Sequence, residues 1–286
     1  MYNVIEVVTL DKLVVNKNSI LYDYLRENLP HKSKNNIKSL LRNECVFVNG
    51  KVITKYDYML KVNDIIEFNK KELFNLKIVY EDNDIIVVDK PSGILTISND
   101  KEKENTLYRE VSNYLKRENK KVFVIHRLDF DTSGIIMFAK NQKVQALYQK
   151  DWNTLAKKRE YTAVVVGKCK DKGHIESYLK QTKTLFVYSS RDKTGLFAVT
   201  DYEKILGNDK YSMLKIFIST GRRNQIRCHM ADISHPIVGD TRYNKGVNPI
   251  NRLCLHANRL EIVNPITNKL MVFTSDIPEE FYEIIK

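Results

Sequence analysis

A short polar segment between two apolar runs constrains the fold more than any other feature of this chain. Residues 126–134 read His-Arg-Leu-Asp-Phe-Asp-Thr-Ser-Gly and lie between the apolar runs 122–125 and 135–139. Both runs are short and rich in β-branched residues, so each is predicted to be a buried strand. The segment between them is too short and too polar for anything but a tight loop at the edge of a sheet. Asp131 can bond the backbone two residues on, and Gly134 can adopt a positive φ.

Two charged residues of this loop have no structural role in that turn. Turn chemistry accounts for Asp131 but leaves Arg127 and Asp129 unexplained. A carboxylate held at the mouth of a sheet beside basic groups is a candidate nucleophile or general acid–base. The alternative is a hairpin whose charges only face water, and the rest of the chain decides between the two.

Composition favours a folded protein with a polyanionic partner. The 286 residues are 43% hydrophobic, with 16 Tyr and 11 Phe, which is enough for one large unit or two compact ones. Lys and Arg number 47 against 35 Asp and Glu, a net charge of +12. Such a balance indicates nucleic acid or an acidic membrane surface as partner. The alternative is a basic surface that serves solubility alone.

Cysteine spacing and hydropathy predict a soluble cytoplasmic protein. The four cysteines are far apart, so they are expected to be reduced, mostly buried thiols rather than a disulfide framework or metal site. No apolar stretch approaches the ~18 residues of a membrane-spanning helix. The first residues lack the basic start and apolar core of a secretion signal.

A charged stretch at 69–75 is the predicted domain boundary, dividing the chain into residues 1–72 and 73–286. After it, the runs 78–82 and 85–88 flank an Asn-Asp turn and are expected to form a hairpin at the entry to the second domain.

The first segment is expected to contain two helices and a hairpin. One helix covers 20–29 and stops at Pro30, and a second begins near Ser33, which can cap it. Its inward stripe is Ile37, Leu40 and Leu41, and another face carries Lys34, Lys38 and Arg42 at i, i+4 and i+8. Like charges four apart destabilise a helix by a few tenths of a kcal/mol per pair, so this face suggests an anionic partner, with a merely solvated face as the alternative.

The order of these elements resembles the S-four-type RNA-binding module over about residues 10–69. A strand and Asn-Gly turn at 45–51 follow the basic helix, and a strand at 62–68 closes the unit. Asn63-Asp64 stands where Gly-Asp is usual in this module. The resemblance implies a small α+β RNA-binding domain.

The loop at 126–134 resembles the signature of pseudouridine synthases of the RluA family. Four further segments match family motifs in the family's order, and together the five span about residues 85–265. These are residues 88–94, 158–167, 220–230, and 235–243 with 253–257. The resemblance implies an α+β fold: a catalytic domain with a central mixed, largely antiparallel β-sheet flanked by helices and loops.

The resemblance also assigns roles to individual residues. Asp129 would be the catalytic aspartate, Arg127 would enter the RNA beside the target uridine, and Tyr161 would lie against the uracil and ribose. Tyr161 is expected to open an apolar strand, and without the resemblance a tyrosine there is ordinarily a packing residue. Lys90 would pack near the active loop or contact phosphate; otherwise it is an exposed lysine in a tight turn.

The segment 220–230 carries three arginines at the start of a predicted helix. Arg223 and Arg227 lie one turn apart, where the helix dipole and the guanidinium groups together favour anions. The resemblance makes Arg227 the partner of the catalytic aspartate, and Arg222 and Arg223 are expected to bind RNA; the alternative is phosphate binding without chemistry. Asn224 replaces the family's usual His, so it receives no proton-transfer role. Segments 235–243 and 253–257 are interpreted as structural.

Pseudouridine formation needs no redox cofactor and no metal, and the sequence has no dinucleotide loop, phosphate-binding loop or Cys/His metal spacing. The target base must be extruded from its stack, so the expected partner is a structured stem-loop, ribosomal RNA first and transfer RNA as alternative. A monomer with no obligate protein partner is expected. The rival from another class is a non-catalytic RNA-binding or ribosome-assembly factor. A third reading takes Asp129 and Asp131 as a metal pair for phosphoester hydrolysis.

Overall fold

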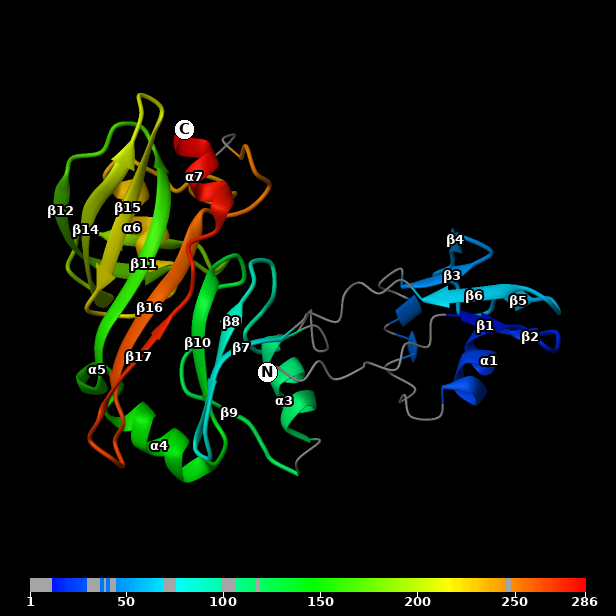
Figure 1. Cartoon of the computed structure of the whole chain (residues 1–286). Helices are drawn as coiled ribbons and strands as arrows, with labels where there is room; N and C mark the ends of the chain where they lie inside the picture. Colours follow the sequence, from blue (N-terminus) through cyan, green and yellow to red (C-terminus); the bar gives the residue numbers. More distant parts are fainter. Residues whose placement is uncertain are drawn as a thin grey trace. The chain divides into compact units, whose positions relative to one another are not determined.

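The computed structural model divides the chain into two compact units, Met1–Asn75 and Leu76–Lys286 (Figure 1). The boundary predicted between residues 72 and 73 lies within 69–75, outside the described residues. The described residues are 12–29, 37–38, 40–41, 45–68, 76–98, 106–116, 119–244 and 248–286.

The N-terminal unit is a small α+β domain. A four-stranded sheet has the order β1-β6-β3-β4, and β2 pairs with β5. Its elements are β1 Lys12–Val14, β2 Ser19–Ile20, α1 Leu21–Asn28, β3 Val46–Val48, β4 Lys51–Val52, β5 Met59–Leu60 and β6 Ile65–Phe68. Residues 37–38 and 40–41 are also helical, and Ile37 and Leu41 are buried while Leu40 is partly buried, which confirms the predicted inward stripe.

Asparagines take the left-handed positions of this domain. Asn49 and Gly50 have φ values of 50° and 76°, the geometry of an Asn-Gly hairpin turn between β3 and β4. Asn63 has a φ of 72°, a conformation that asparagine tolerates better than most non-glycine residues. The Asp64 carboxylate accepts the Asn49 amide and the Lys61 N–H, both at 2.8 Å. Asn63 therefore meets the backbone requirement at the place where the module usually has glycine.

The larger unit is built on one mixed sheet. Its strand order is β13-β12-β14-β15-β11-β16-β10-β8-β7, with β17 beside β16 and β9 beside β10 (Figure 1). Among the described strand pairs, only β10–β16 is parallel. The strands are β7 Lys77–Glu81, β8 Ile85–Lys90, β9 Phe123–Val124, β10 Ser133–Ala139, β11 Ala156–Val166, β12 Lys172–Gln181, β13 Val187–Ser190, β14 Leu196–Gly207, β15 Tyr211–Ile218, β16 Leu255–Val263 and β17 Leu270–Thr274. This is the expected α+β class.

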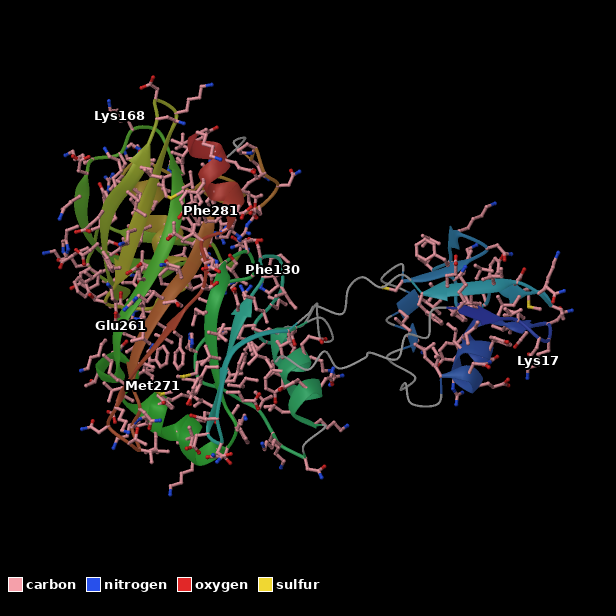
Figure 2. The ribbon with its side chains drawn as sticks, in the orientation of Figure 1. Lys17, Phe130, Lys168, Glu261, Met271 and Phe281 are labelled. Atoms are coloured by element: carbon pink, nitrogen blue, oxygen red, sulfur yellow. The ribbon has the colours of Figure 1, made fainter. Side chains whose placement is uncertain are left out.

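Helices pack on this sheet. α6 contacts β12, β13 and β14, α4 contacts β9 and β10, and α7 contacts β15. Phe281 of α7 is fully buried in one core cluster with Met230 of α6 (Figure 2). The helices are α3 Leu107–Lys116, α4 Gln142–Lys150, α5 Trp152–Leu155, α6 Gln225–Asp232 and α7 Glu279–Ile285. None of the helices within the described ranges is long and apolar enough to cross a membrane.

The polar loop lies where β10 meets β16 near the middle of the sheet. Gly134 pairs with Ala257 across that parallel contact, and a Cβ on Gly134 would lie 2.2 Å from the Ala257 carbonyl oxygen. With its φ of 112°, this position admits only glycine without rearrangement. The predicted strands on either side of the loop are confirmed as β9 and β10, which pair with each other.

Two further expectations can be compared with the structure. All four cysteines are buried free thiols, as predicted. The strand expected to open at Tyr161 instead begins at Ala156, because the charged residues Lys158, Arg159 and Glu160 pair with β16 and extend β11. The charged sequence of these residues does not indicate a strand. They form one because their backbone groups pair with those of β16.

Candidate active site

The loop after β9 is fixed by hydrogen bonds to residues 92–96. Thr96 accepts the Leu128 N–H and donates to the Leu128 carbonyl, the Gly93 N–H donates to the Phe130 carbonyl at 3.0 Å, and Ser92 donates to the Asp131 carbonyl at 2.6 Å. The Thr132 N–H closes the turn onto the Asp129 carbonyl at 3.2 Å. The loop backbone is therefore held rigidly beside the Pro-Ser-Gly turn.

Lys90 is buried under this loop and is not available to phosphate. Its ammonium donates to the carbonyls of Pro91, Ile94 and Phe130 at 2.9, 2.8 and 3.0 Å. Burial lowers the pKa of Lys90 to about 7, against the opposing charges of Asp131 and Asp129. The expected phosphate contact is wrong for this conformation, and Lys90 instead joins the two loops. The packing alternative was the correct one.

Asp129 is half-buried at the mouth of the site. Its Oδ2 accepts the Asn224 N–H at 3.3 Å. Burial raises the pKa of Asp129, while the charge of Arg227, the Asn224 N–H and the charge of Arg223 act to lower it. The carboxylate is thus partly withdrawn from water and surrounded by groups that favour its ionised form.

Arg227 pairs directly with Asp240. Nε and Nη2 of Arg227 donate to the two Asp240 oxygens at 2.7 and 2.8 Å, and Asp240 also accepts the N–H groups of Arg242 and Tyr243. Nη1 of Arg227 lies 3.8 Å from Asp131. The expected pairing of Arg227 with Asp129 is therefore indirect: Arg227 acts on Asp129 through its charge, and Asp240 holds it in place.

Asp240 is a site residue that sequence interpretation missed. It follows Gly239 in a segment assigned to the scaffold, yet its side chain is fully buried against Arg227. The only signal in the sequence was a carboxylate in a segment otherwise apolar and turn-like. The Asp131 side chain also differs from expectation, since it faces Arg227 rather than capping its own turn.

Tyr161 lies on β11 between two charged groups. Burial raises the pKa of Tyr161 to about 12; Arg159 acts to lower it and Asp129 to raise it. The phenol is therefore neutral and protonated near pH 7. It lines a cavity of about 20 Å³ whose other walls are His126, Ile135, Trp152, Arg159, Glu160, Ala257, Arg259 and Leu260.

His126 is neutral near pH 7, and one of its ring nitrogens is already used as an acceptor. Its Nε2 accepts the Met137 N–H at 3.0 Å, and its ring stacks on Trp152 at 4.5 Å between centroids. Burial lowers the pKa of His126 to about 3. The first residue of the motif thus fastens the loop to β10.

The remaining predicted RNA-binding residues are on the surface where the structure describes them. Arg127, Arg222 and Arg223 are exposed, and Arg222 donates to the Phe197 carbonyl at 3.1 Å. Phe130, which follows Asp129, also exposes its ring (Figure 2). Lys38 is exposed, 5.9 Å from the centre of the Tyr22 ring. Lys34 and Arg42 lie outside the described residues.

The helix α6 begins at an unusual residue. Asn224 precedes it with a φ of 50°, and this left-handed turn aims its N–H at Asp129. Its side-chain oxygen accepts a bond from Arg227 Nη1 at 3.4 Å. Asparagine in place of histidine thus keeps a hydrogen-bonding role without a titratable group. Guanidinium groups around Asp129 and Asp131 also make this pair a poor cation site, and no cluster of three or more His, Cys, Asp or Glu in the described ranges is arranged to hold a metal.

Comparison with known proteins supports the family to which the motifs point. Residues 84–232 match the model of the RNA pseudouridylate synthase family, and residues 21–66 match the S4 domain. An uncharacterized RNA pseudouridine synthase of Bacillus subtilis is 34% identical over 75% of this chain and 73% of its own length. Ribosomal large subunit pseudouridine synthase D of Escherichia coli K12 is 28% identical over 92% and 88%.

Solved structures support the same fold. Human RNA pseudouridylate synthase domain containing 1 superposes with a TM-score of 0.60 at 21% identity, covering 72% of this chain and 84% of its own. These findings confirm the resemblance drawn from the sequence. The chain belongs to the RNA pseudouridylate synthase family and carries an S4 domain on its N-terminal side.

Proposed function

We propose that this enzyme converts specific uridines of large-subunit ribosomal RNA to pseudouridine, with Asp129 as its catalytic residue. Relatives that align along most of both chains are named ribosomal large subunit pseudouridine synthase D, which supports this substrate. The single observation that carries the assignment of Asp129 is its position: a half-buried carboxylate at the mouth of the sheet, bonded to the Asn224 N–H and surrounded by cations.

The reaction places definite demands on the site. The bond from the uracil nitrogen to the ribose breaks, the base turns, and a bond forms through carbon five, so nothing is oxidised. Asp129 supplies the charged oxygen beside the ribose and base, and Arg227 stabilises that charge from its fixed place on Asp240. Tyr161, neutral and flat, holds the loosened uracil while it turns.

RNA binding is distributed over both units. Arg222 and Arg223 are proposed to bind phosphates beside the site, and Arg127 to enter the stack that the uridine leaves. On the N-terminal unit, the basic helix with Lys34, Lys38 and Arg42 is proposed to hold the stem electrostatically. Residues 1–72 then form the RNA-binding domain and 73–286 the catalytic domain of a cytoplasmic monomer.

Modification mapping in cells tests this proposal. Ribosomal and transfer RNA from cells with and without the gene are compared for pseudouridine, and the deleted strain is complemented with wild type, Asp129→Asn or Asp171→Asn. Asp171 is an exposed carboxylate paired with Lys204, so its variant controls for loss of one charge. We expect a ribosomal RNA site that wild type and Asp171→Asn restore and Asp129→Asn does not.

Other outcomes are decisive as well. A site lost from transfer RNA alone would reject the ribosomal substrate. Full restoration by Asp129→Asn would reject the catalytic assignment, and an unchanged map would favour a non-catalytic factor on this fold. Light scattering of the purified chain checks the monomer.

A further inference from the structure

Arg159 is a buried cation for which the proposed reaction has so far given no use. Its side chain is 9% exposed, and its Nη2 donates to the Ser219 carbonyl. Its Nε is buried and has no hydrogen-bond partner in the described part of the chain. The titratable groups that interact with its charge include the Tyr161 phenol, the Arg222 guanidinium and the His126 ring, none of which is an anion near neutral pH.

The nearest carboxylate along the chain serves another purpose. Glu160 accepts the Asn258 amide at 2.9 Å and pairs with Lys158 at 3.1 Å. Arg159 and Tyr161 are two apart on β11 and line one cavity, and Glu160 lines it too, with its carboxylate held by Asn258 and Lys158. Among the described residues Arg159 makes no ion pair, and its Nε is a free donor in the lining that it shares with Tyr161.

The position of Arg159 relates it to the reacting groups. Tyr161 is near enough to both Asp129 and Arg159 for the charge of each to act on its pKa. Arg159 and Tyr161 line the same small cavity, and Nη1 of Arg159 lies under Gly221, 3.2 Å from where a Cβ would be. A uracil held at Asp129 against the Tyr161 ring would turn one edge toward Arg159.

The size of the cavity limits what can enter it. About 20 Å³ is room for one water-sized atom and not for a whole phosphate group. Buried donors in native proteins are almost always paired, so an unpaired guanidinium donor at this place calls for an acceptor that arrives with the substrate. A single oxygen atom fits both the donor and the space.

We propose that Arg159 is a substrate-binding residue that donates to one oxygen of the flipped uridine nucleotide. The inference rests on the proposed function and adds a recognition group to the same site. The oxygen belongs either to a carbonyl of the base or to a non-bridging position of the adjoining phosphate. Both are acceptors for a guanidinium, and sulfur substitution of one or the other tells them apart.

The test uses single-turnover kinetics on a stem-loop transcript of the RNA segment in which the wild-type enzyme forms pseudouridine. The target nucleotide carries ordinary oxygen, a 2-thio or 4-thio base, or a phosphorothioate. The variants are Arg159→Met, Arg159→Lys, and Lys158→Met, which removes the neighbouring positive charge, one that pairs with Glu160 and lies over the Phe217 ring. Thermal melting of each variant accompanies the kinetics.

We expect Arg159→Met to slow the oxygen substrate by about 10- to 100-fold, the loss of one hydrogen bond to a charged group. Arg159→Lys should recover part of that loss, and Lys158→Met should match wild type. One sulfur substitution should slow wild type and have no further effect in Arg159→Met. The sulfur substitution whose effect disappears in Arg159→Met identifies whether Arg159 binds an oxygen of the base or of the phosphate.

A purely structural Arg159, acting only through Ser219, would slow all substrates equally and leave every sulfur effect intact, which would overturn the inference. Wild-type rates in Arg159→Met would do the same. A wild-type enzyme that modifies no RNA would instead reject the proposed function and this inference with it.

Discussion

Replacing Asp240 with asparagine tests how strongly the site depends on a fixed arginine. Asp240 Oδ1 accepts Arg227 Nη2 and the N–H groups of Arg242 and Tyr243, so the amide oxygen of asparagine would keep that place. The amide nitrogen would then face Arg227 Nε, where two donors meet at the former 2.7 Å contact. The variant therefore breaks a buried ion pair while keeping the shape of the side chain.

The magnitude follows from burial. Removing one partner of a buried pair costs about 3–5 kcal/mol, because it leaves an uncompensated charge. In a unit of this size each kcal/mol shifts the melting temperature by about 2–4 °C, so a fall of roughly 6–20 °C is expected. Activity should fall as well, since Arg227 is free to leave its position relative to Asp129.

Urea denaturation followed by tryptophan fluorescence measures this change. Trp152 is the only tryptophan of the chain and lies in the catalytic unit, stacked on His126, so its signal reports that unit. Asp131→Asn is the matched control: it removes a carboxylate 3.8 Å from Arg227 whose side chain is 38% exposed, and should cost at most about 1 kcal/mol. Equal losses in the two variants would refute the idea that Asp240 holds Arg227.

Three further changes have expected outcomes. The pKa of Lys90 is lowered from 10.5 to about 7 in the folded chain, so between these two pH values the unfolded chain binds more protons than the folded chain. The unfolding free energy of wild type, relative to that of Lys90→Met, should therefore rise as the pH increases above 7. Urea titrations at several pH values measure this difference. Arg223→Gln removes a charge that lowers the pKa of Asp129, so the acid limb of the rate–pH profile should move to higher pH in single-turnover assays. Lys38→Gln should weaken RNA binding and reduce the slope of log affinity against log salt by about 0.7–0.9, measured by filter binding.

Local patterns predicted the elements that position the site. The runs beside the polar loop became β9 and β10 because short β-branched stretches have few other uses, and the Asn-Gly turn at 49–50 required left-handed backbone. The stripe of Ile37 and Leu41 was visible at helical spacing. These strands, this turn and this helical stripe are determined by residues close together in the sequence, so they can be predicted from it.

Pairings between distant residues account for what was missed. For Lys90 the sequence left packing near the loop, phosphate contact and an exposed turn open, because the three carbonyls that bury its ammonium come from two separate loops. The partners Arg227 and Asp240 come from a helix and from the loop after it. Arg159 lies in the motif at 158–167 but was not singled out, because its burial against the Ser219 carbonyl and its unpaired Nε, among the described residues, depend on the packing of β11.

The cations around Asp129 divide into a fixed group and a free group, and the division suits an enzyme whose substrate is a polyanion. Arg227 is locked by Asp240 and Lys90 by carbonyls, so phosphates cannot draw either of them away from the carboxylate. Arg223 is exposed, and in the proposed function it pairs with the RNA backbone. When Arg223 pairs with a phosphate, its charge stabilises the ionised form of Asp129 less, while the stabilisation by Arg227 is unchanged. If exposed arginines alone stabilised the ionised form of Asp129, that stabilisation would be lost when RNA phosphates paired with those arginines.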